Sequence, residues 1–151
     1  MKLHARAVGL ISVAVAIWWT VSANATSLSI FPDPLVASPG NSVRMSVDYK
    51  AQGAQVSGLQ FDLLYDPSVL SITTATAGSG AIDASKTLGD NLISPGDLRF
   101  IISGVNKNVL GDGSVADLTV QVSNSAPAGP YSLFLRNIVA SDPNGLPVTI
   151  K

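Results

Sequence analysis

The stretch LQFDLLYDPSVL, residues 59–70, determines the expected fold more than any other part of this 151-residue chain. Apolar and polar residues alternate through most of its first half, as they do in a β-strand with one buried face. Asp66-Pro67 then interrupts the pattern, and apolar character resumes at Leu70. We therefore expect a strand that ends near Tyr65, a corner, and a second strand that begins near Leu70.

Short apolar runs alternate with turn clusters along the rest of the chain after residue 25, without a sustained helical stripe. This pattern predicts an all-β sandwich or barrel. The clusters SPGN (38–41), SPGD (94–97) and DPNG (142–145) supply proline together with Gly or Asn, which accept a positive φ in tight turns. Residues 77–86 are expected to form a loop or an irregular edge. The expected strands are 28–31, 42–50, 56–65, 70–77, 87–93, 98–103, 114–122, 131–138 and 148–150, with a bulge near 116–117.

The first 25 residues have the features of a secretory signal peptide. A short basic start with Lys2 and Arg6 precedes an apolar run over residues 7–21, and alanines at positions 23 and 25 fit the rule for signal peptidase cleavage. We expect a helical signal peptide over residues 1–25 and one exported domain over residues 26–151. The domain would be secreted or extracellular, in the periplasm or on the cell surface, with no membrane contact after cleavage. The alternative is an uncleaved N-terminal anchor, although the run is shorter than the roughly 20 residues that span a bilayer.

The composition of residues 26–151 argues against several classes of function. The chain has no Cys, and its single His and both Trp lie within the first 25 residues. Seven Lys or Arg against ten Asp and no Glu leave a net charge of −3, which argues against a nucleic-acid partner. Without His or Cys, neither a Ser-His-Asp arrangement nor a His/Cys metal site can form, and most Asp residues fall in turns. We expect no catalytic residue, no cofactor and no metal.

Alternation assigns two faces to the expected strands over residues 56–65 and 98–103. The inward residues would be Leu59, Phe61, Leu63, Tyr65, Leu98, Phe100 and Ile102. The outward residues would be Gln60, Asp62, Leu64, Arg99, Ile101 and Ser103. The strand over residues 131–138 is partly apolar on both faces. If Phe134 or Ile101 is exposed, it marks a contact surface, and the alternative is that loops cover both side chains.

Six segments, in their order and spacing, resemble cohesin modules. They are SPGNSVRMSV (38–47), GLQFDLLYDPSVL (58–70), GDLRFIISG (96–104), GDGSVADLTVQV (111–122), SAPAGPYSL (125–133) and SDPNGLPV (141–148). The resemblance covers residues 28–151 and implies a nine-stranded jelly-roll β-sandwich, related to bacterial cellulose-binding modules. When the nine expected strands are numbered in chain order, the resemblance implies one sheet with the order 8-3-6-5. It implies a second sheet of strands 1, 2, 4, 7 and 9, with the last strand beside the first. Asp66 would then serve the corner by accepting backbone N–H groups.

Cohesins bind dockerins, which are small calcium-loaded helical modules carried on polysaccharide-degrading enzymes. The resemblance implies that the outer face of the 8-3-6-5 sheet binds such a partner. An apolar residue, Ile101, would be ringed there by polar groups, as in many protein interfaces. The expected partner-binding residues are Gln60, Asp62, Arg99, Ile101 and Ser103, flanked by Asn91 and Asn106. We expect a secreted, non-catalytic module that binds a dockerin-bearing or other extracellular protein during polysaccharide degradation.

The relation to cellulose-binding modules leaves a second function open, which is direct glycan binding. Flat sugar-binding platforms use exposed Trp or Tyr, but residues 26–151 contain no Trp. Tyr49, Tyr65 and Tyr131 fit inward positions of the expected strands, so a glycan would be bound through Asn, Asp and Gln. A polysaccharide is therefore the alternative partner.

Overall fold

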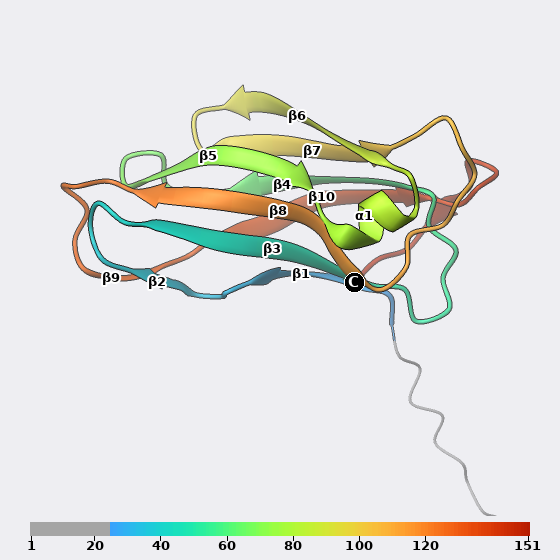
Figure 1. Ribbon diagram of the computed structural model, residues 1–151, viewed down its shortest axis with the longest axis horizontal. Coiled ribbons are helices and arrows are strands. Elements are labelled where there is room, and N and C mark those ends of the chain that lie inside the picture. Colours follow the sequence, from blue (N-terminus) through green and yellow to red (C-terminus); the bar gives the residue numbers. More distant parts are fainter. Residues whose placement is uncertain (1–24) are drawn as a thin grey trace, which may run out of the picture.

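The computed structural model describes residues 25–151, which form a sandwich of two antiparallel β-sheets (Figure 1). One sheet has the order β1-β3-β8-β5 and the other β11-β10-β4-β7-β6, while β2 and β9 form a small separate pair. The strands are β1 (Ser27–Phe31), β2 (Leu35–Ala37), β3 (Ser42–Lys50), β4 (Gly58–Leu64), β5 (Leu70–Ala77), β6 (Thr87–Ser94), β7 (Asp97–Ser103), β8 (Gly113–Val122), β9 (Gly129–Tyr131), β10 (Phe134–Ser141) and β11 (Pro147–Val148). The predicted all-β sandwich is confirmed.

The N-terminal prediction lies almost entirely outside the described residues. Of the expected signal peptide, the structure describes Ala25 alone. Within residues 25–151, no helix has the length and apolar character needed to cross a membrane.

The strand order agrees with the expected sheets except at the C-terminal end. The order β10-β4-β7-β6 corresponds to the expected 8-3-6-5 sheet. The ninth expected strand was placed wrongly, because β11 pairs with β10 and extends this same sheet. The tight turn after β10 explains the difference: the Asp142 N–H donates to the Leu146 carbonyl (2.8 Å) and returns the chain directly onto β10. The chain still reaches the first strand, since the Lys151 N–H donates to the Thr26 carbonyl (2.9 Å).

The described residues form eleven strands where nine were expected. The additional strands, β2 and β9, have three residues each and pair with one another. They are too short to show an alternating pattern, and prolines at positions 32, 34 and 130 obscure them further.

A short helix, α1 (Ser79–Asp83), replaces the loop expected over residues 77–86. The helix packs against β8 and buries Ala81. Its close approach needs glycine, because a Cβ on Gly78 would lie 2.5 Å from the Ser114 carbonyl oxygen. The contact with β8 stabilises this helix, which the small and polar residues of the segment would not predict from sequence alone.

The core lies between the two sheets and follows the predicted alternation. The expected inward residues of β4 and β7 are buried, whereas Tyr65, also expected to point inward, lies after β4 and is half-buried. The rings of Phe61 and Phe100 lie 5.4 Å apart between their centroids. Tyr49 and Tyr131 are also buried, as predicted. The expected bulge is present in β8, where Val115 is the additional residue in the pairing with β3.

The Tyr65-Asp66-Pro67 corner carries the chain from β4 in one sheet to β5 in the other. The Tyr65 N–H donates to the Gly96 carbonyl (2.9 Å), which ties the corner to the turn between β6 and β7. An Asp66 carboxylate oxygen accepts the Ser68 N–H (2.9 Å), and the Asp66 carbonyl accepts the Leu70 N–H (2.9 Å). The predicted structural role of Asp66 is confirmed.

Two glycine substitutions test this corner. Gly96 has φ +80°, and a Cβ there would lie 2.4 Å from the Tyr65 carbonyl oxygen; Gly145 has φ +82° with nothing near its Cβ position. We expect Gly145→Ala to cost about 1 kcal/mol from backbone strain alone, and Gly96→Ala to cost at least about 2–3 kcal/mol because a clash adds to the strain. Urea unfolding of both variants measures the difference. Equal destabilisation of the two variants would contradict the close packing of the corner.

Candidate functional site

The candidate site is the outer face of β10-β4-β7-β6, where the five predicted residues lie on adjacent strands. The antiparallel register of β4 and β7 places Gln60 opposite Ile101 and Asp62 opposite Arg99. Ser103 lies at the end of β7, opposite Thr87 of β6. Ile101 and Ser103 are exposed, and Gln60 and Arg99 are half-buried. The structure therefore brings all five residues onto one surface, although Asp62 is covered.

Asp62 lies beneath Arg99 with 1% of its side chain exposed. Arg99 donates to both carboxylate oxygens, from Nε at 2.6 Å and from Nη2 at 2.9 Å, and Asn137 donates to Oδ2 at 2.7 Å. Hydrogen bonds from Arg99, together with that from Asn137, hold the pKa of Asp62 below its usual value of 3.8, against the opposing effect of burial. Asp62 consequently orients the Arg99 guanidinium and presents no carboxylate oxygen to a partner.

Asn137 reaches Asp62 from an irregularity in β10. The pairing of β10 with β4 shifts register between Arg136 and Val139, and Asn137 has φ +49°. Asn tolerates this left-handed conformation better than most residues with a side chain. The sequence contains no local signal for this contact, because it depends on where β10 pairs with β4.

A row of charged and amide side chains crosses the face from β10 to β6. In register, Arg136 lies opposite Asp62, Asp62 opposite Arg99, and Arg99 opposite Asn91. Arg136 also donates to the buried carboxylate of Asp97 (2.6 Å). The carboxylates of Asp62 and Asp97 are buried, and the guanidinium groups of Arg99 and Arg136 are more exposed. The exposed part of this region therefore consists mainly of hydrogen-bond donors.

An apolar row lies next to the charged one. Val139 and Ile101 flank Gln60 in register, with 58% and 43% of their surfaces exposed. Gly89 follows on β6 and adds no side chain beside Ile101. These strands form a shallow depression of about 200 Å³ around Gln60, Ile101 and Val139. Val139 was not predicted, because the expected strand ended at residue 138 and the irregularity in β10 reverses the alternation before this residue.

Two further residues that the sequence singled out are Phe134, expected to mark a contact surface if exposed, and Asn106, expected to flank the face. Phe134 is 63% exposed at the start of β10, which answers the question that the sequence left open. The Asn106 amide is engaged within its own loop, donating to the Ser85 carbonyl (2.8 Å) and accepting the Asn108 N–H (3.0 Å). Lys86 anchors the same loop by donating to the Asn106 carbonyl (2.9 Å), and burial lowers the pKa of this lysine. The Asn106 side chain therefore stabilises the loop.

The chemistry of the face is that of recognition. Arginine and amide donors surround an exposed apolar centre, a combination typical of surfaces that bind another macromolecule. Across residues 25–151, no three His, Cys, Asp or Glu side chains are grouped so that they could hold a metal ion. The fold and the face together define a β-sandwich of the binding-module class.

The family follows from comparison with known proteins. The family model of the cohesin domain matches residues 31–149, which is most of the sequence. The chain belongs to the cohesin family. No curated protein matches the sequence.

Solved structures of cohesins share the fold. The sixth cohesin of scaffoldin B from Acetivibrio cellulolyticus, solved in complex with a Cel5 dockerin mutant, is 24% identical with a TM-score of 0.72, over 85% of this chain and 94% of that one. The OlpA cohesin of Clostridium thermocellum, in complex with the dockerin Doc918, is 16% identical with a TM-score of 0.71, over 85% and 94%. A non-cellulosomal cohesin from the archaeon Archaeoglobus fulgidus is 19% identical with a TM-score of 0.68, over 84% and 85%.

Substitution of Asp62 tests the electrostatics beneath the face. We expect Asp62→Asn to lower the free energy of unfolding by about 1–3 kcal/mol at neutral pH, because Arg99 and Asn137 lose a charged acceptor. The folded pKa of Asp62 is depressed, so its stabilising effect is present above 3.8 and disappears as the pH falls through the lower folded value. Urea unfolding across the acidic range should therefore show the two proteins converging.

The matched control is Asp83→Asn, which changes an exposed carboxylate of α1. It should change stability by less than about 0.5 kcal/mol. A constant gap between wild type and Asp62→Asn at every pH would contradict the assigned role of the Asp62 charge.

Proposed function

We propose that this protein is an exported, non-catalytic cohesin module that binds a dockerin-bearing protein through the outer face of β10-β4-β7-β6. Family membership supports the binding role, and two of the similar cohesins were solved with dockerins bound. The observation that carries the proposal is the exposed apolar pair of Ile101 and Val139 beside the Arg136–Asp62–Arg99 row. An exposed apolar centre with polar neighbours is the arrangement expected of a binding hot spot.

The face suits a helical partner. Dockerins are helical modules, and the last carbonyl groups of a helix lack partners within it. Arg99 and Arg136 present guanidinium donors, and a cation near a helix C-terminus is also favoured by the helix dipole. Gln60 and Ser103 can donate or accept at the margin of the contact, while Ile101 and Val139 bury apolar surface.

Asp62 keeps a place in the proposed site as a positioning residue. Its bidentate contact fixes the plane of the Arg99 guanidinium, so less side-chain freedom is lost when a partner binds. Four of the predicted residues would therefore touch the partner, and the fifth, Asp62, would hold Arg99 in place.

The proposed location is extracellular. The predicted signal peptide over residues 1–25 supports export, and the cohesin from Acetivibrio cellulolyticus belongs to a scaffoldin and was solved with a Cel5 dockerin. We propose that the partner is likewise an exported protein, and that a polysaccharide-degrading enzyme carries the dockerin.

Ile101→Asp tests the face. We expect the affinity for a dockerin to fall tenfold or more, because a carboxylate would be buried against an apolar contact. The probes are recombinant dockerins encoded in the same genome, together with the Cel5 dockerin, and isothermal titration calorimetry measures binding.

Val36→Asp is the matched control, since Val36 is an exposed valine on β2, outside the two main sheets. It should bind like the wild type, and both variants should keep the wild-type melting temperature within a few degrees. Failure of every dockerin to bind would refute the proposed partner. Binding unaffected by Ile101→Asp would refute the proposed face.

A further inference from the structure

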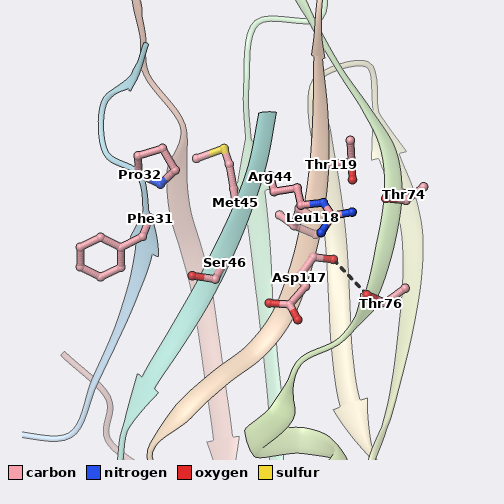
Figure 2. A pocket seen from close by; sticks show the side chains of 10 residues that line it. All are labelled: Phe31, Pro32, Arg44, Met45, Ser46, Thr74, Thr76, Asp117, Leu118 and Thr119. Atoms are coloured by element: carbon pink, nitrogen blue, oxygen red, sulfur yellow. Dashed lines mark hydrogen bonds between the residues drawn. The ribbon is translucent and has the colours of Figure 1, made fainter. Parts of the chain in front are cut away.

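A groove of about 670 Å³ lies over the outer face of the other sheet, β1-β3-β8-β5, on the side of the sandwich opposite to the face described above (Figure 2). One row of side chains crosses all four strands, because Phe31 pairs with Ser46, Ser46 with Asp117, and Asp117 with Thr76. Neighbouring strands lie about 4.8 Å apart, so this row is about 14 Å long. A second row runs beside it through Arg44, Thr119 and Thr74.

The polar groups of the groove are largely free to bind a ligand. Apart from the backbone pairing of the strands, the hydrogen bond marked in Figure 2 runs from the Thr76 hydroxyl to the Asp117 carbonyl (3.4 Å). The hydroxyls of Ser46, Thr74 and Thr119 therefore have no partner within the groove. Hydroxyls both donate and accept, so they complement a ligand that itself carries many hydroxyl groups.

The charges of the groove favour a neutral ligand. Its lining residues contain one cation, Arg44, and one anion, Asp117, and both are exposed. Ser114 donates to Oδ1 of Asp117 (2.5 Å), which orients the carboxylate and leaves Oδ2 available to the groove. An anionic polymer such as nucleic acid would need an excess of cations. Arg44 and Asp117 instead offer a paired donor and acceptor to vicinal hydroxyls.

Phe31 and Pro32 line one edge of the groove, and the Phe31 ring lies over the free edge of β1 (Figure 2). Phe31 ends β1 with 55% of its surface exposed, and Pro32 follows it. An exposed aromatic ring beside rows of hydroxyls matches a ring-shaped ligand with one C–H face and polar edges. Phe31 thus supplies an exposed aromatic ring in a part of the chain that has no Trp.

An extended peptide fits the groove less well than a sugar. Peptides that bind sheets usually add a strand to a free edge. The floor here is formed by β3 and β8, which are inner strands paired on both sides. Their backbone groups are used within the sheet, so recognition must depend on side chains.

We propose that this groove binds a neutral oligosaccharide, with the sugar face against Phe31 and the hydroxyls bound by Arg44, Asp117 and the threonine side chains. The site is independent of the proposed dockerin-binding function, because it lies on the opposite sheet. It gives the glycan-binding alternative a location and a set of residues.

An NMR titration of the ¹⁵N-labelled protein tests the proposal, with cello-, xylo- and chito-oligosaccharides as separate probes. At least one probe should cause saturable shifts in amide signals of β3, β5 and β8 and leave those of β4 and β7 unchanged. Phe31→Ala and Arg44→Gln should each weaken that binding tenfold or more. Arg44 is exposed, so its variant tests the groove even if Phe31→Ala proves unstable.

Leu146→Ala is the control, since Leu146 is an exposed apolar residue in the turn between β10 and β11 and does not line the groove. It should bind the sugar like the wild type, and Phe31→Ala should bind a dockerin like the wild type. No saturable shifts with any of the probes, or shifts confined to β4 and β7, would overturn the proposal. Wild-type sugar affinity in both groove variants would overturn it as well.

Discussion

The antiparallel register between β4 and β7 is the constraint on which the rest of the structure depends. Phe61 and Phe100 pair across it, and their rings pack in the core. Because side chains alternate strictly along a strand, this inward pair places Asp62 with Arg99 and Gln60 with Ile101 on the outer face. A slip of one residue would exchange core and surface together. The candidate binding surface is thus fixed by the same packing that stabilises the fold.

Much of this arrangement could be predicted because it depends on local patterns. Alternation identified the inward residues of β4 and β7, and the Pro-Gly clusters identified turns in which Gly40 and Gly96 have φ +80°. Asp66 was assigned to the corner because Asp commonly accepts nearby backbone N–H groups. The sheet order came from the resemblance to cohesins and agrees with the structure for β10-β4-β7-β6.

The features that escaped prediction depend on contacts between distant parts of the chain. Asp62 was expected on the surface, but Arg99 and Asn137 cover it from β7 and β10. Val139 became part of the face because β10 changes register at residues 137 and 138. The α1 helix forms because it packs against β8 and buries Ala81. No short window of sequence contains these partners.

The two-layered architecture has a consequence for how such a module could work. Sheets of a sandwich pack about 10 Å apart, so ligands on opposite outer surfaces do not collide. If each surface holds its proposed ligand, a tethered enzyme would be kept close to an immobilised carbohydrate chain. Its encounters with that chain would become effectively intramolecular, with a local concentration far above that of the free enzyme. Weak contacts on each side would then suffice for durable attachment.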